Sequence, residues 1–370
     1  MASMTVGGEV VDDVAVAGDY EGLRRHRTER VLIAPSLPRE EVEMVSFEAS
    51  NILVTSYHVP IDVERGRLFA NQTYTNAAQW VPGERPVIAD GRFTIESKPI
   101  RLPGRYVVVG GPIDGVWYHW MVSWCARITL LKKLRPDLFA DESVRFLVDG
   151  RAAADPFAAV LAAVGCPLDR VTFSYHARDY LLERAVLVSF PDQRYLYSDI
   201  VRELAADVKR SFDIPPDASQ TGRVYTSREH FTYPKRRLAN FSEVEPVLKA
   251  NGFEIVSMGA LSGPTQVKLF HEAEIVLGSH GSDLTSVLFC RPGAQVIVVE
   301  NERNVKSGIG ASLTELARIA GAQYRCVVVE EEVRSDIDYG LFQNVHNRDL
   351  ILPPHVLRAA LAEAGASPVY

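Results

Sequence analysis

The strongest constraint on the fold of this chain is the regular alternation of short apolar runs and helix-forming segments in its second half. Apolar runs typical of buried strands lie at 224–226, 253–258, 274–277, 296–299 and 324–329, with helical segments expected between them. Short apolar strands that are joined by helices form a parallel sheet with both faces covered. The pattern therefore predicts a Rossmann-like domain over residues 218–345.

The turn after the run at 274–277 predicts an anion site. The run ends in Gly278-Ser279-His280-Gly281, and a helix is expected over 283–290. A strand, a glycine turn and a helix N-terminus bring free backbone N–H groups and the positive end of the helix dipole to one point. Hydroxyl donors are supplied by Ser279, Ser282, Thr285 and Ser286. These features favour capture of a diphosphate; the alternative is an ordinary strand-to-helix turn with Asp283 as its N-cap.

The first half of the chain is less regular. Residues 1–20 are expected to be flexible, and residues 29–100 combine short β-rich runs with many turn-forming residues. From residue 105, strands are predicted at 106–109, 144–148, 170–175 and 185–190, and helices at 115–134, 153–164 and 195–212. A break at 213–217 ends an N-terminal domain over residues 21–214. The C-terminal segment 350–370 carries a helix at 354–364 that is a candidate to cross back to this domain.

Composition narrows the function classes. Of 370 residues, 47% are hydrophobic and 24% are charged, as in globular proteins. A net charge of -7 argues against a nucleic-acid partner, which favours a basic surface. No apolar run approaches the ~18 residues of a membrane helix, and the N-terminus lacks the apolar core of a signal peptide, so a cytoplasmic protein is expected. The D-x-D string at 336–338 is interpreted as solvated surface, and no metal site is predicted.

Three motifs in this order resemble glycosyltransferase family 61. They are Tyr118-His119-Trp120, then Tyr225-Thr226-Ser227-Arg228 with Arg236-Arg237-Leu238-Ala239-Asn240, and finally His280-Gly281 followed by Leu284-Thr285, Phe289 and Pro292-Gly293. The resemblance covers about residues 105–330. It implies an α/β fold of GT-B architecture, in which two Rossmann-like domains face a cleft. It also implies an inverting glycosyltransferase that moves a sugar from a nucleotide donor, a UDP-sugar, to an acceptor hydroxyl.

The resemblance also implies roles for individual residues. Donor or diphosphate binding is expected of Arg228, Arg237, Ser279, His280, Gly281, Ser282, Asp283, Thr285 and Glu300. Glu300 ends the run at 296–299 and would bind ribose hydroxyls. Enzymes of this architecture stabilise the leaving diphosphate with a helix dipole and basic side chains, so neither a metal nor a cofactor is expected.

The acceptor side is expected to use His119 as the general base, with Asp114 as the nearest carboxylate. The sequence departs from the family at Ser123, where a carboxylate is common, and at Asp283, where a small residue is common. Two alternatives therefore stay open: a non-catalytic sugar-nucleotide-binding protein, and another enzyme on this fold such as an epimerase. The acceptor, whether glycan, small molecule or protein, and the oligomeric state are left open.

Overall fold

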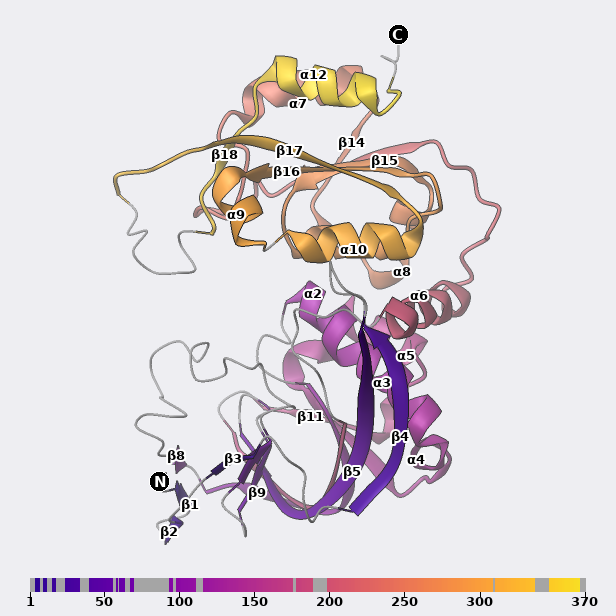
Figure 1. The fold of residues 1–370 in the computed structure, drawn as a ribbon, viewed down its shortest axis with the longest axis vertical. Coiled ribbons are helices and arrows are strands. Elements are labelled where there is room, and N and C mark those ends of the chain that lie inside the picture. The colour runs from indigo at the N-terminus through magenta and orange to yellow at the C-terminus, as the bar shows by residue number, and fades with distance from the viewer. Residues whose placement is uncertain are drawn as a thin grey trace. The chain divides into compact units, whose positions relative to one another are not determined.

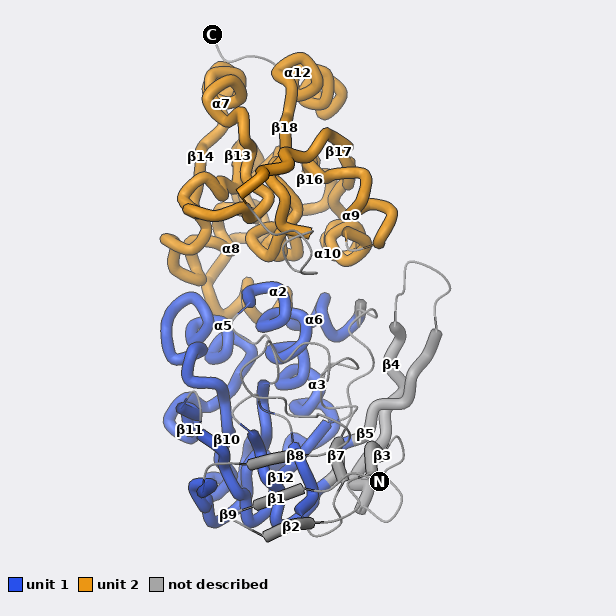
Figure 2. The backbone as a smooth tube through the Cα atoms, turned by 90° about the vertical axis from the view of Figure 1, so that its left-hand side faces the viewer, with its two compact units in different colours: residues 1–204 blue, residues 205–370 orange. Residues whose placement is uncertain are grey.

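Two compact units make up the chain in the computed structural model, residues 1–204 and residues 205–370 (Figure 2). The structure describes residues 4–6, 9–11, 15–17, 24–33, 40–55, 58, 60–63, 67–69, 93–95, 98–110, 116–175, 178–188, 198–308, 310–336 and 346–366. Each unit combines its own β-sheet with helices, which confirms the predicted α/β class. The predicted linker at 213–217 lies within the second unit.

The first unit is built on a mixed nine-stranded sheet of order β11-β10-β9-β12-β5-β6-β7-β3, with β4 paired to β5. Its strands are β3 (Ala15–Ala17), β4 (Arg24–Ile33), β5 (Glu40–Val54), β6 (Pro60–Asp62), β7 (Arg67–Phe69), β9 (Ile100–Val109), β10 (Val144–Asp149), β11 (Val171–Ser174) and β12 (Tyr180–Val188). The strands β9 to β12 form a parallel part, and β5 joins it antiparallel to β12. A small separate sheet pairs β1 (Met4–Val6) with β2 (Glu9–Val11) and β8 (Phe93–Ile95).

A continuous helical run follows β9 and carries the predicted acceptor-side histidine. It consists of α2 (Trp117–His119), the π-helical segment η2 (Trp120–Cys125) and α3 (Ala126–Leu134). In η2 the amide of Ala126 donates to the carbonyl of Met121, five residues earlier, and such π-turns are often found at functional sites. The other helices of this unit are α4 (Pro136–Ala140), η3 (Gly150–Ala153), α5 (Phe157–Ala163), η4 (Leu168–Arg170) and α6 (Ser198–Ser211), whose last residues belong to the second unit.

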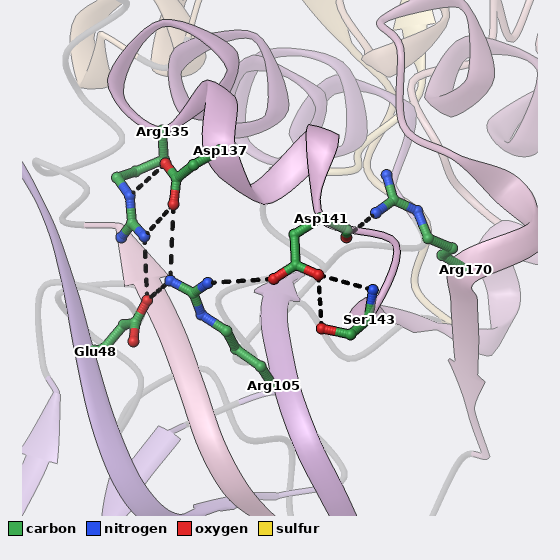
Figure 3. Close-up of polar contacts among 7 residues, drawn as sticks. All are labelled: Glu48, Arg105, Arg135, Asp137, Asp141, Ser143 and Arg170. Atoms are coloured by element: carbon green, nitrogen blue, oxygen red, sulfur yellow. Dashed lines mark hydrogen bonds and ion pairs between the residues drawn. The ribbon is translucent and has the colours of Figure 1, made fainter.

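Charged side chains connect these helices to the first unit's sheet (Figure 3). Arg105 of β9 pairs with Glu48 of β5, and its guanidinium also lies 3.9 Å from carboxylate oxygens of Asp137 and Asp141. Arg135, which precedes α4, donates to Glu48 and to Asp137. The Arg135 side chain is buried, so its charge needs these carboxylates to replace the water that it has lost.

The second unit contains the predicted Rossmann-like sheet, with six strands in the order β14-β13-β15-β16-β17-β18. These are β13 (Gly222–Thr226), β14 (Glu254–Val256), β15 (Ala273–Ser279), β16 (Gln295–Asn301), β17 (Gln323–Glu331) and β18 (Leu350–Ile351). All are parallel except β18, which runs antiparallel to β17. The chain moves from β13 to one side and then to the other, so β13 and β15 flank a topological switch point. Ligands of open α/β sheets bind at such points, beyond the carboxyl ends of the strands.

Helices cover both faces of this sheet, with α7 and α12 on one face and α8 and α10 on the other (Figure 1). The bounds are α7 (Phe241–Ala250), η5 (Met258–Ala260), α8 (Gly263–His271), η6 (Ser282–Phe289), α9 (Glu302–Ser307), α10 (Ala311–Ala320) and α12 (Pro354–Glu363). Leu357 and Leu361 of α12 share one apolar core with Val244 and Leu248 of α7. The C-terminal helix, a candidate to cross to the first domain, thus packs within the second unit.

Two local predictions in the second unit differ from the structure. The Ser242-x-x-Glu245 pattern suggests a capping box, but α7 begins at Phe241 with Asn240 as its N-cap. The Asn240 amide does not cap the helix, because it exchanges two hydrogen bonds with the backbone of Leu352. The helix expected over 283–290 is a 3₁₀-helix, η6, that begins at Ser282.

The backbone near residue 349 returns to the loop that follows β13. The amide of Leu350 donates to the Arg237 carbonyl, and the Asp349 carboxylate accepts the amides of Lys235 and Arg237. The same carboxylate also receives the Arg237 guanidinium, with Nε at 2.8 Å from Oδ2 and Nη2 at 2.5 Å. Asp349 is buried, so this carboxylate organises the loop from inside the protein.

We expect Asp349→Ala to lower the free energy of unfolding by about 3–5 kcal/mol, because it removes the carboxylate that accepts from two amides and from a partly buried guanidinium. The measurement is urea-induced unfolding followed by circular dichroism. Asp199→Ala is the control, since Asp199 and its partner Arg202 are both exposed and such pairs contribute about 0–1 kcal/mol. Equal stabilities of the two variants would contradict the role given to Asp349.

Candidate functional site

The candidate site of the second unit lies where β13 and β15 end, at the switch point of the sheet. Thr226 closes β13, and its Cα partner on β15 is Gly278. A Cβ atom at Gly278 would lie 2.0 Å from Thr226 Oγ1, so a side chain there would displace the Thr226 hydroxyl. The close approach of the two strands brings the segments after them, 227–237 and 279–285, together.

Arg228 is the central cation of this site. Its side chain is buried, and its Nη1 donates to Asp283 Oδ2 at 2.5 Å, whereas its Nε donates to the Lys235 carbonyl at 2.7 Å. The guanidinium also lies 5.3 Å from the ring centre of Phe231. A Cβ atom at Gly281 would lie 2.1 Å from Arg228 Nη1. Gly281 is therefore required for space, since the guanidinium occupies the volume that a side chain would need.

The contact of Asp283 accounts for the presence of an acidic residue where the family commonly has a small one. Its carboxylate is the partner of Arg228, and it makes no other hydrogen bond to the residues that the structure describes. The negative charge at the first turn of η6 thus neutralises a buried guanidinium instead of capping the helix. A ligand phosphate at Arg228 has to share that cation with Asp283.

Several hydroxyl groups of the site lack a protein partner. The side-chain oxygens of Thr226, Ser279 and Thr285 are buried and form no hydrogen bond within the described part of the chain. Ser282, at the start of η6, is partly exposed. Buried polar atoms are usually satisfied, so three unsatisfied hydroxyls beside an open helix N-terminus are suited to a polar ligand.

His280 and Glu300 form a buried pair at the carboxyl ends of β15 and β16. His280 Nδ1 lies 2.5 Å from Glu300 Oε2, and the other Glu300 oxygen accepts from Asn301 N and Asn304 Nδ2 at 2.9 Å. Burial raises the pKa of the Glu300 carboxyl, but the contacts with His280, Asn301 and Asn304 outweigh it and leave that pKa below its ordinary value. The sequence predicts that Glu300 binds ribose; in the structure Oε1 accepts two N–H donors, and Oε2 faces His280 without an aligned hydrogen bond.

Lys235 and Arg236 add positive charge to the site, although neither is among the donor-binding residues expected from the sequence. Burial and, to a lesser extent, the nearby Arg228 lower the pKa of Arg236 to about 10. Burial also lowers the pKa of Lys235, again with contributions from Arg236 and Arg228. Three mutually repelling cations in a buried setting favour an anion. The sequence signal was the basic run Lys235-Arg236-Arg237.

Arg237 has a different role from the one expected. Its guanidinium donates to Asp349 through two nitrogen atoms and to the Phe231 carbonyl through the third. All three nitrogens of the group are thus engaged by the protein. Arg237 thus supports the loop that carries Arg228 and Lys235.

His119 of the first unit lies in a setting that removes its charge. Burial lowers the pKa of its imidazole to about 4, so the ring is neutral at physiological pH. The ring of Tyr118 contacts it edge-on, with centroids 5.1 Å apart. Ser123, at the position of the family carboxylate, is buried in η2. Asp114, the other candidate, lies outside the described residues.

The structure also shows a polar cluster in the first unit that sequence reasoning missed. His58 Nε2 lies 2.7 Å from Ser174 Oγ at the end of β11, and Asp149 at the end of β10 contributes a nearby charge. Burial lowers the pKa of His58 to about 4. His58 and Ser174 are 116 positions apart in the sequence, so no local sequence pattern could have grouped them.

Two negative findings concern the described residues. They contain no group of three or more His, Cys, Asp or Glu side chains that could hold a metal ion. Their helices include none with the length and apolar character needed to cross a membrane. The Asp336 carboxylate of the D-x-D string is exposed and pairs with Arg334, while Asp338 lies outside the described ranges.

Comparison with known proteins agrees with these observations. The family model described as Glycosyltransferase 61 matches residues 117–297. The matched region begins at the helix that carries His119 and ends inside β16, and it includes Arg228, His280 and Asp283. No curated protein matches the chain. The match and the three motifs agree on one conclusion: residues 117–297 of this chain are of glycosyltransferase family 61.

Proposed function

We propose that this glycosyltransferase binds a nucleotide-activated sugar, a UDP-sugar, at the switch point of the second unit and transfers the sugar with inversion to an acceptor hydroxyl. The observation that carries the proposal is the group of cations around Arg228, which lies beside the open N-terminus of η6. A diphosphate would meet Arg228, Lys235 and Arg236 together with the hydroxyls of Ser279 and Thr285. We further propose that the protein has the GT-B architecture and that its reaction needs no cofactor.

Charge accounts for the choice of a diphosphate. Repulsion by neighbouring cations contributes to the lowered pKa values of Lys235 and Arg236, and an anionic ligand relieves that repulsion. Charged hydrogen bonds from a guanidinium to phosphate contribute more than neutral ones. Basic side chains and the helix N-terminus would also stabilise the charge that grows on the leaving diphosphate, without a metal.

The proposed reaction is a single displacement. A base removes the proton of the acceptor hydroxyl while that oxygen forms a bond to the anomeric carbon of the donor. The bond from this carbon to the diphosphate oxygen breaks, and the electron pair leaves with the nucleoside diphosphate. Attack opposite the leaving group inverts the anomeric centre. His119, whose imidazole is neutral, is the proposed base on the acceptor side.

The test of the function is release of free UDP from a UDP-sugar that depends on an added acceptor, with the anomeric configuration of the product read by NMR. Acceptor-dependent release and an inverted product are the expected results. Nucleotide binding without any turnover over a panel of sugars and acceptors would favour the non-catalytic alternative. A nucleotide thermal-shift panel selects the probe, since a ligand at 100 times its Kd stabilises by ~2.7 kcal/mol.

Arg228→Ala should weaken UDP binding by ~1.5–3 kcal/mol, because it removes a charged hydrogen bond to the diphosphate. Isothermal titration calorimetry measures the effect. Arg223→Ala is the matched control, since Arg223 lies near the start of the same strand, where it pairs with Glu274. Equal UDP affinities in wild type and Arg228→Ala would remove Arg228 from the donor site.

Gly281→Ala should weaken UDP binding in the same direction as Arg228→Ala while the protein stays folded. The new methyl group needs the space that the Arg228 guanidinium fills, so the cation has to move. Gly259→Ala serves as the control, because a Cβ atom there meets no atom within 4 Å. If Gly281→Ala binds UDP as tightly as wild type does, the position of Arg228 does not matter to the ligand.

His119→Ala should lower kcat by ~10²–10⁴-fold and leave UDP affinity unchanged, because His119 belongs to the first unit. The pH profile adds a second check. A base has to be unprotonated, so activity is lost only as the pH falls through its pKa of about 4. We therefore expect kcat at saturating donor to show no histidine-type decline between pH 8 and pH 5.5. Wild-type turnover in His119→Ala, with a large loss in Asp114→Asn, would assign the base to Asp114.

A further inference from the structure

Nε2 of His280 is the second ring nitrogen of the buried His280–Glu300 pair, and its role rests on the proposed donor site. Nδ1 lies 2.5 Å from Glu300 Oε2 without the alignment of a hydrogen bond, and neither atom has another partner among the described residues. The backbone amide of His280 donates to the Val299 carbonyl at 3.0 Å. Nε2 makes no hydrogen bond to any residue that the structure describes, and this atom is not fully buried. Nε2 is thus the atom of the ring that a ligand can reach.

The partners of Glu300 determine which nitrogen of His280 carries the proton. One carboxylate oxygen accepts from two N–H donors, Asn301 N and Asn304 Nδ2, and Asn304 is held in turn by His346. The second oxygen faces Nδ1. A carboxylate can only accept, so the neutral ring has its proton on Nδ1 and a lone pair on Nε2. That lone pair repels a phosphate oxygen.

We propose that the nucleoside diphosphate binds together with a proton, which His280 Nε2 takes up and then donates in a hydrogen bond to the phosphate. The imidazolium is formed between two anions, the phosphate on one side and Glu300 on the other. Glu300 acts as a positioning residue, because it directs the bound proton to the face of the ring that meets the ligand. Protonation has to accompany binding, since the free site holds the ring neutral.

The charged groups around His280 support this order of events. Arg228 and Arg236 come from the loop after β13, Glu300 from β16 and His346 from the segment before β18. Burial lowers the pKa of His280, the carboxylate of Glu300 raises it, and the two arginines lower it again, which leaves that pKa below 6.5. A diphosphate adds negative charge and offsets the arginines, so it raises this pKa.

Proton uptake by His280 determines how UDP affinity depends on pH. Between the pKa of the free site and the higher pKa of the complex, binding takes up a proton, so UDP affinity falls as the pH rises, by up to about tenfold per pH unit. Below the pKa of the free site the ring is already charged, and this contribution to the pH dependence disappears. A site that used His280 only for packing would show neither behaviour.

Glu300→Gln distinguishes positioning from packing. The glutamine oxygen has to face Asn301 N and Asn304 Nδ2, so its NH₂ group faces His280 Nδ1. The neutral ring then carries its proton on Nε2 and can donate to phosphate without an added proton. We expect Glu300→Gln to bind UDP within about tenfold of wild type near neutral pH, with little proton uptake and a flat affinity profile.

The experiment is calorimetry of UDP binding to the full chain in buffers of different ionisation enthalpy, which gives the number of protons taken up. The titrating phosphate of UDP contributes equally to each variant, so the difference between wild type and His280→Gln isolates the histidine. Glu274→Gln is the control, because Glu274 pairs with Arg223 at the start of β15. It should keep the wild-type proton count.

Three outcomes decide the proposal. Proton uptake that is present in wild type and lost in both His280→Gln and Glu300→Gln supports it. UDP binding with the same proton count in wild type and His280→Gln overturns it and leaves the proposed donor site intact. Absence of nucleotide binding overturns both. In the free protein, ¹⁵N spectra of the ring provide a test without ligand: the proton should lie on Nδ1 in wild type and on Nε2 in Glu300→Gln, and the same tautomer in both would refute the mechanism.

Discussion

The buried guanidinium of Arg228 is the constraint on which the candidate donor site depends. A charge without solvent needs partners, and three separate parts of the second unit meet that need: Asp283 on η6, the Lys235 carbonyl and the ring of Phe231. Gly281 leaves the space in which the guanidinium lies. The turn between β15 and η6 and the loop after β13 therefore determine each other's position, and neither can change without displacing this cation.

The loop that carries the cations depends in turn on residues more than 100 positions away. Asp349 accepts from Lys235, Arg237 and the Arg237 guanidinium, and Asn240 exchanges hydrogen bonds with Leu352. Arg236 reaches the His346 carbonyl and adopts a positive φ of 60° to do so. Two of the family's basic and polar motif residues, Arg237 and Asn240, thus support the loop.

Sequence reasoning predicted the parallel sheet of the second unit well, because its strands are short apolar runs and their links are local. It also predicted that Arg228, His280 and Asp283 lie near one another, since they follow the carboxyl ends of neighbouring strands. It could not predict which partner each charge selects. Arg237 and Glu300 are engaged by Asp349 and by His280, contacts that only the folded chain brings about. In the first unit the sequence indicated only short β-rich runs where β4 and β5 lie, because the antiparallel pairing of these long strands leaves no pattern beyond alternating residues.

The π-helical segment in the first unit changes how this chain is to be compared with its relatives. In an α-helix, residues four apart lie on one face, so Ser123 would be the neighbour of His119. The extra residue that a π-turn accommodates shifts every later side chain around the helix axis. An ungapped alignment through 120–125 with a relative that is α-helical there would equate residues that point in different directions, and the partner of the histidine in such a relative need not have its counterpart at Ser123.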